Sequence, residues 1–250
     1  MWTTSSVLVD YDDPNYPVYF IKQIKDKHKI SMVKKCFYKD NPFASSERVQ
    51  NEIWNWFKTY FLDAIDFRYF EIMSQMINSN DLPTQVKNEL IFWISCVCDR
   101  VMADLAVNMI LKSSKEGKSQ IEMNKIYDYA DQLTHLDQKK LKKAVKNFID
   151  LLEFSNITYS NKESIVVNNF KPSLETFAFA LFYLFDQKQI PINILRSYKL
   201  KYLMLDINEI IDYIKKLEQS GLVNFTVKKE IFNLEPKIEF EELHNYFLKK

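Results

Sequence analysis

Two stretches of the chain, 65 residues apart, each show a helical pattern that runs directly into a candidate β-hairpin. The first helix is expected to close at Asn156 before a hairpin at 157–169, and the second to close at Gly221 before a hairpin at 222–234. Asn and Gly best tolerate the left-handed backbone conformation that ends many helices. Because a helix followed by a hairpin forms the second half of a winged helix-turn-helix, the sequence predicts two such units.

The correspondence continues along both helices and into the hairpins. Apolar residues recur at the spacing of one helical face, and the same face returns 65 positions later. Asn168 and Asn233 also align at this distance. The alternative is that two unrelated helix–hairpin segments have similar lengths. The aligned apolar residues are Val145, Phe148, Ile149 and Leu152 in the first helix and Ile210, Tyr213, Ile214 and Leu217 in the second.

Glycine is scarce, since the chain contains only Gly117 and Gly221. Phosphate-cradling loops and long β-meanders both need glycine, so its scarcity favours helices. The expected fold class is therefore mainly α, with two winged helix-turn-helix-like units that each end in a short β-hairpin. We expect an N-terminal helical region at 1–83 with a possible helix-turn-helix, a first winged unit at 84–170, and a second winged unit with a terminal helix at 171–250.

Capping residues and apolar periodicity give the expected helices. Residues 84–112 are read as one long helix, 113–119 as a loop and 121–133 as the next helix. Asp206 with Glu209 is expected to cap the helix at 207–219, and Ser173 the helix at 174–186. The other expected helices are 18–27, 31–38, 46–65, 67–77, 137–154, a short one from 191, and 241–248.

No motif indicates catalysis or a cofactor. Gly117-Lys118-Ser119 mimics the end of a phosphate-binding loop, but Lys112 stands where that loop needs its first glycine. The histidines are scattered, and the thiols of Cys96 and Cys98 would point to opposite sides of a helix, so no metal site is expected. We therefore expect a protein that is not an enzyme and that uses no cofactor.

The cysteine count and the N-terminus bear on location. Three cysteines and an N-terminus without a basic and apolar leader favour a reducing cytoplasm. The densest apolar run, at 90–98, is much shorter than the roughly 20 residues that a membrane span needs. A cytoplasmic protein without a membrane partner is expected.

Lysine is the most informative residue type, and it gathers on the helix at 137–154. Five lysines lie within eight positions without an acid among them, and all of them except Lys140 cover the face opposite the apolar residues of the same helix. That geometry suits a helix that packs on a core and faces a polyanion, although a merely solvated lysine face is the alternative. The candidate DNA-binding residues are Lys139, Lys140, Lys142, Lys143 and Lys146, together with Lys34, Lys35, Arg48, Arg196, Lys199, Lys201, Lys228 and Lys229.

The kind of cation and the aromatic residues refine this hypothesis. Lysine without arginine suits phosphate neutralisation better than base reading, so salt-sensitive binding to double-stranded DNA with weak sequence preference is expected. Eight aromatic residues between Trp54 and Phe70 could stack on bases, but their clustering favours a packed core or a protein interface. An adaptor that binds protein would leave this aromatic segment partly exposed.

Several segments, taken in order, resemble the BrxA family of BREX bacteriophage-defence systems. The resemblance covers nearly the whole chain as a pattern of helices and spacings, and lysine stands where most of the family's arginines are expected. The segments that carry it are Tyr19-Phe20-Ile21 through Lys34-Lys35, Asn41-Pro42-Phe43, Ser46-Glu47-Arg48, Leu90-Ile91-Phe92 through Asp99-Arg100 to Asp104, 121–133, 214–234 and Phe240-Glu241-Glu242-Leu243.

The resemblance implies a mainly helical, non-enzymatic DNA-binding component of a multi-gene antiviral system. Its partners would be double-stranded DNA and other BREX proteins, such as a methyltransferase, an ATPase and a phosphatase-like protein. The family has also been likened to the NusB antitermination fold, so an RNA-binding role is an alternative, beside that of an adaptor or scaffold in the defence complex.

Overall fold

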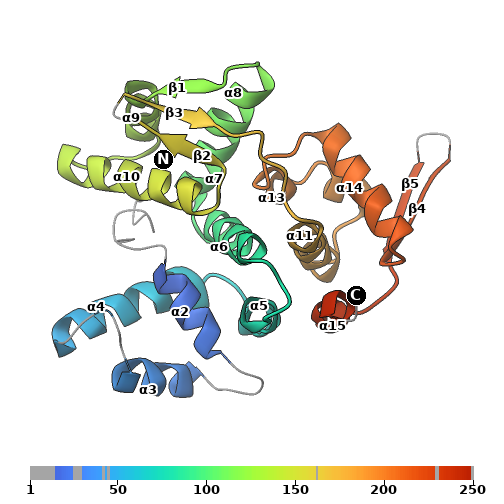
Figure 1. The fold of residues 1–250 in the computed structure, drawn as a ribbon, viewed down its shortest axis with the longest axis horizontal. Coiled ribbons are helices and arrows are strands. Elements are labelled where there is room, and N and C mark those ends of the chain that lie inside the picture. Colours follow the sequence, from blue (N-terminus) through green and yellow to red (C-terminus); the bar gives the residue numbers. More distant parts are fainter. Residues whose placement is uncertain are drawn as a thin grey trace.

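The computed structural model describes residues 15–24, 30–40, 43, 46–161, 163–228 and 231–248. The fold is mainly helical, with two small antiparallel sheets that lie in different parts of the molecule (Figure 1). Helices at the N-terminus form one region, and the two predicted helix–hairpin units form the other two. Within the described residues, no helix combines the length and the hydropathy that crossing a membrane would require.

The N-terminal region is built from α2 (Asn15–Gln23), α3 (Ile30–Asp40), α4 (Glu47–Phe57), the π-helix η1 (Lys58–Leu62) and α5 (Phe67–Asn78). Ser46 caps α4 by accepting a hydrogen bond from the backbone N–H of Val49, and η1 continues that helix, as the sequence predicts. Aromatic rings pack these helices together, and Phe20 stacks on Phe57 with centroids 4.3 Å apart. Helix α2 begins before the expected helix at 18–27 and ends at Gln23, and residues 25–27 of that expected helix lie outside the described residues.

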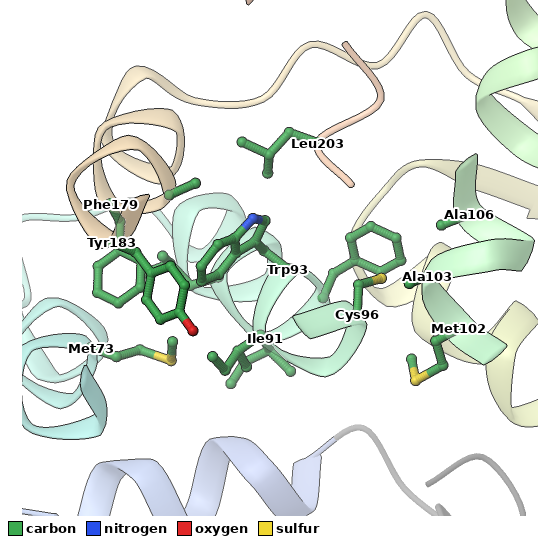
Figure 2. Packing of buried hydrophobic residues seen from close by; sticks show 14 of the residues in the cluster. Met73, Ile91, Trp93, Cys96, Met102, Ala103, Ala106, Phe179, Tyr183 and Leu203 are labelled. Carbon is green, nitrogen blue, oxygen red and sulfur yellow. The ribbon is translucent and has the colours of Figure 1, made fainter. Parts of the chain in front are cut away.

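Helix α6 (Thr84–Cys98) lies at the centre and packs against helices of all three regions (Figure 1). Residues 89–96 of α6 are all buried, so the helix has no solvent-facing side over this stretch. Trp93 is enclosed by Phe179 and Tyr183 from one side, while Cys96 faces Ala103 and Ala106 (Figure 2). The hydrophobic core is therefore continuous across the three regions.

The single helix expected at 84–112 is wrong, because the chain breaks at Asp99. This residue has extended backbone angles of φ −123° and ψ 114°, and its side chain accepts hydrogen bonds from the N–H groups of Val101 and Met102. An aspartate that caps backbone N–H groups in this way competes with helix continuation. The chain then forms α7 (Arg100–Asp104), the π-helix η2 (Leu105–Leu111) and α8 (Lys112–Lys115).

The first unit follows with β1 (Gln120–Glu122), α9 (Met123–Leu133), α10 (Gln138–Phe154), β2 (Thr158–Ser160) and β3 (Ser164–Val167). Strand β3 lies in the middle of an antiparallel sheet with the order β1-β3-β2. The helix pair and hairpin agree with the predicted winged unit, while β1 occupies residue 120 and the first two residues of the helix expected at 121–133. A strand of three residues with one buried side chain, Ile121, is too short for alternation to reveal.

The second unit contains α11 (Leu174–Asp186), α12 (Pro191–Leu195), α13 (Tyr198–Lys201), α14 (Ile207–Gln219), β4 (Val223–Lys228) and β5 (Ile231–Pro236). The predicted caps are confirmed: Ser173 caps α11, and Asp206 with Glu209 forms a capping box on α14. The chain ends in η3 (Phe240–Glu242) and α15 (Leu243–Leu248), which contacts α5.

The internal repeat is confirmed at the level of single hydrogen bonds. Asn156 and Gly221 both have positive φ, 57° and 80°. The residue after each donates its N–H across the end of the helix, Ile157 to the carbonyl of Leu152 and Leu222 to that of Leu217, both at 2.9 Å. These equivalent bonds show that the two helices end in the same way.

A glutamate in the last turn of each helix also holds the following hairpin. The carboxylate of Glu153 accepts the N–H of Ser160 at 2.5 Å, and that of Glu218 accepts the N–H of Phe225 at 3.0 Å. Donor and acceptor stand 65 positions later in the second unit. The repeat thus fixes the angle between each helix and its wing.

The alignment of Asn168 with Asn233 is wrong. Thr158 pairs with Val167, whereas its counterpart Val223 pairs with Pro236, four positions beyond the repeat distance. The second hairpin is longer at its tip, so β5 runs past the expected end at residue 234. The structural counterpart of Asn168 is residue 237.

Candidate nucleic-acid interface

Helix α10 has the amphipathic character that the sequence predicts. Its apolar side is buried in the first unit through Leu141, Val145 and Phe148. Asp137 caps the helix by accepting a hydrogen bond from the N–H of Lys140 at 2.9 Å. The opposite side is the lysine face, which we define as the exposed residues Lys139, Lys140, Lys142, Lys143 and Lys146.

Acidic neighbours divide the lysine face into two groups. The ammonium group of Lys140 lies 3.8 Å from Asp137, and that of Lys146 lies 3.2 Å from Asp150. The hydrogen bond from Lys140 N–H, aided by the nearby ammonium groups, lowers the pKa of Asp137, so this carboxylate stays charged. Lys139 and Lys142 form no ion pair with any described residue. Within the described residues, these two lysines without an ion pair therefore lie in the first half of α10, where the charge of Asp137 also acts on Lys139.

The position of α10 in its unit suits contact with a groove. It follows α9 after a four-residue turn and leads into the wing, so it is the second helix of the helix-turn-helix. In such motifs the second helix lies in the major groove while the first crosses the backbone. On the neighbouring strand β2, Tyr159 is 56% exposed, and it was not singled out from the sequence. A tyrosine in a short hairpin carries no sequence signal of its own exposure.

The equivalent helix of the second unit is engaged differently. Lys115, from α8 of the first unit, lies 2.5 Å from the carboxylate of Glu209 and 3.4 Å from that of Asp206 at the start of α14. The hydrogen bond from Glu209 N–H lowers the pKa of Asp206, and Lys115 adds to this effect. On the exposed side of α14, Lys215 pairs with Asp212 at 3.5 Å. The start of α14 thus faces the first unit and lacks an acid-free lysine face.

The predicted basic residues of the N-terminal region are exposed but lie apart from the lysine face in the chain. Lys34 stands over the rings of Tyr38 and Trp54, at 5.5 and 5.9 Å from their centroids. Lys35 is exposed on the same helix, and Arg48 pairs with Glu52 at 2.9 Å.

The predicted basic residues of the second unit have different surroundings. Arg196 is exposed after α12. Lys199 is half-buried, with its ammonium 4.6 Å from the ring centroid of Tyr183, and burial lowers its pKa, so it is poorly placed for a phosphate. Lys201 lies over Tyr198. Lys228 ends strand β4, and Lys229 lies outside the described residues.

The aromatic segment from Trp54 to Phe70 forms part of the core. Trp54, Trp56, Phe57, Phe61, Tyr69 and Phe70 are all buried, while Tyr60 and Phe67 are half-buried. Buried rings cannot stack on bases or meet a partner. The expectation of a packed core is confirmed, and of these eight rings only Tyr60 and Phe67 have the partial exposure that the adaptor hypothesis requires.

Among the described residues, no three His, Cys, Asp or Glu side chains are grouped so that they could hold a metal ion. Comparison of the chain with protein-family models, with curated proteins and with solved structures found no match.

Proposed function

We propose that the protein binds double-stranded DNA through the lysine face of α10, as a non-enzymatic component of a BREX-type defence system. The observation that carries the DNA proposal is the exposed lysine face on the second helix of a helix-turn-helix, with its apolar side anchored in the core. The link to phage defence rests on the sequence resemblance to the BrxA family.

The chemistry of lysine determines how such binding would work. A lysine ammonium group neutralises phosphate as a point charge, without the forked geometry that reads guanine. Binding then releases counterions from the DNA, which makes affinity fall steeply with salt and leaves sequence preference weak. The exposed Tyr159 on the adjoining wing adds a phenol that could donate a hydrogen bond to a phosphate.

The two units would then have different roles. The first presents α10 to DNA, while the start of α14 is occupied by Lys115 and its acids. We assign the second unit to support of the first, because inserting α14 into a groove would bring Glu209 and Asp212 toward phosphates.

Fluorescence anisotropy with duplex DNA, duplex RNA and single-stranded RNA tests this function. Lys142→Glu/Lys143→Glu should abolish DNA binding, because it reverses two charges on the lysine face. The matched control is Lys215→Glu/Lys216→Glu, which changes net charge equally on two exposed residues of α14 and should bind nearly as wild type does.

Equal loss of binding in both variants would show that net charge alone matters, and undetectable wild-type binding would overturn the proposal. A clear preference for RNA would instead favour the antitermination-like role.

A further inference from the structure

A pocket of about 520 Å³ opens between the end of α6, the segment formed by α7 and η2, and helix α13. Its volume lies in the range of roughly 300–1,000 Å³ that is usual for small-molecule sites. The pocket exists because the chain breaks at Asp99 and continues as α7 and a π-helix, and π-helical turns occur frequently at functional sites. It lies on different elements from the lysine face.

Two walls of contrasting chemistry line this pocket. One wall carries Arg100, Asp104 and Asn108, which are spaced four residues apart and so share one side of the α7–η2 segment. The other wall carries Tyr198 and Tyr202, again four residues apart, on α13 and just after it. Side chains that can form hydrogen bonds with the edge of a planar ligand therefore stand opposite aromatic rings that can stack on its face.

The floor of the pocket is unreactive. Cys96 lines it from α6, where its side chain points toward Ala103 (Figure 2). Cys98 also lines it, and burial, reinforced by the charge of Asp99, raises the pKa of its thiol. A protonated thiol is a poor nucleophile, so the floor acts as an apolar surface rather than as a reaction centre.

The aromatic wall has one open ring and one enclosed ring. Tyr198 is 58% exposed, and the ammonium group of Lys201 lies 4.8 Å from its ring centroid. Tyr202 is half-buried, and burial, with the nearby charge of Asp104 contributing, raises the pKa of its phenol. An exposed ring beside a cation is the combination on which a nucleotide base stacks while its phosphate is neutralised.

We propose that this pocket binds a guanine nucleotide, with the base stacked on Tyr198, its polar edge on Asp104 and Asn108, and its phosphate near Lys201. A carboxylate only accepts hydrogen bonds, and the Watson–Crick edge of guanine offers adjacent N–H donors. The amide of Asn108 can donate to the guanine carbonyl. Adenine places a ring-nitrogen acceptor on the equivalent edge, which a carboxylate repels.

Two kinds of ligand carry a guanine base and a phosphate: a free mononucleotide, and an unpaired guanine in a nucleic-acid strand. Both offer the same base edge and a phosphate, and they differ in whether the chain continues past the sugar. The proposal does not depend on duplex binding by α10, since none of its residues belongs to the lysine face.

Isothermal titration calorimetry on the full chain, with the four nucleoside monophosphates and with oligothymidine carrying a single guanine, tests the proposal. Wild type should bind guanosine monophosphate at least tenfold more tightly than adenosine monophosphate. Tyr198→Ala should weaken binding at least fivefold by removing the stacking ring, whereas Tyr198→Phe should retain it. Asp104→Asn should lose the tenfold preference for guanine over adenine.

Thermal unfolding of each variant checks the fold, and Lys215→Glu/Lys216→Glu, on exposed residues of α14 outside both the pocket and the lysine face, serves as the control that should bind nucleotide as wild type does. Binding of the mononucleotide alone would identify the free nucleotide as the source. Tighter binding of the guanine-containing oligonucleotide than of plain oligothymidine would identify the unpaired base. Absence of binding to both probes, or equal binding by wild type and Tyr198→Ala, would overturn the proposal.

Discussion

The salt dependence of DNA binding should distinguish the two groups of lysines on α10. Each phosphate that a lysine neutralises on duplex DNA contributes about −0.9 to the slope of log affinity against log salt. If Lys139, Lys142 and Lys143 each neutralise one phosphate while Lys140 and Lys146 are offset by their carboxylates, the slope is about −2.7, and affinity falls about 40-fold between 50 and 200 mM salt. Lys139→Gln/Lys142→Gln removes two lysines that form no ion pair with described residues. Its slope should be about −0.9, and its affinity should fall only about 3.5-fold over the same range.

The matched control is Lys140→Gln/Lys146→Gln, on the same helix and with the same change in net charge. Asp137 and Asp150 lie 3.8 and 3.2 Å from these two ammonium groups, so each carboxylate repels the phosphate that its lysine attracts. This variant should change the slope by less than about one.

Anisotropy titrations with a fluorescent 20-base-pair duplex at four or more salt concentrations would give each slope. Equal changes in the two variants would refute the division of the lysine face by its acidic neighbours. An unchanged slope in Lys139→Gln/Lys142→Gln would refute phosphate contact by the first half of α10.

Three further predictions concern the framework, and equilibrium unfolding measures each. Gly221→Ala should destabilise the protein by about 1 kcal/mol through backbone strain, because φ is +80° and no atom lies within 4 Å of the added Cβ. Asn156→Gly should leave the free energy of unfolding nearly unchanged. An equal loss of stability in both variants would contradict the account of the helix ends. Asp206→Ala should remove about 1 kcal/mol of capping stability at neutral pH. Since the pKa of Asp206 is lower in the folded state, its stabilisation is present above about pH 4 and is lost as pH falls through the folded pKa; a gap from wild type that stays constant down to pH 2 would contradict this. Glu89→Leu should cost about 1–3 kcal/mol, since the buried carboxylate accepts hydrogen bonds from both the N–H and the hydroxyl of Ser173; a neutral result in a urea titration would show that other groups satisfy this helix start.

Features that depend on a few neighbouring residues could be predicted from the sequence. The capping box of Asp206, the cap at Ser173 and the left-handed residues Asn156 and Gly221 act within one helical turn, so their residue types suffice. The lysine face of α10 followed from helical periodicity alone.

Features that depend on distant contacts could not be predicted. The break at Asp99 interrupts an unbroken helical pattern, and its N-cap geometry is visible only in the structure. Strand β1 is three residues long and is defined by pairing with β3, more than forty positions away. The nucleotide pocket joins a polar row that includes Asp104 to an aromatic row that includes Tyr198, and each row alone looks like an ordinary helix face. Nothing in the sequence indicates that these two rows meet.

Two adjacent residues of α6 form hydrogen bonds with different winged units. The side chain of Asn88 donates to the carbonyl of Phe154 at the end of α10, while Glu89 holds Ser173 at the start of α11. Both winged units are therefore held by hydrogen bonds to the same helix, α6, which restricts rotation of one unit relative to the other. Any duplex held on α10 would therefore keep one fixed orientation relative to the second unit.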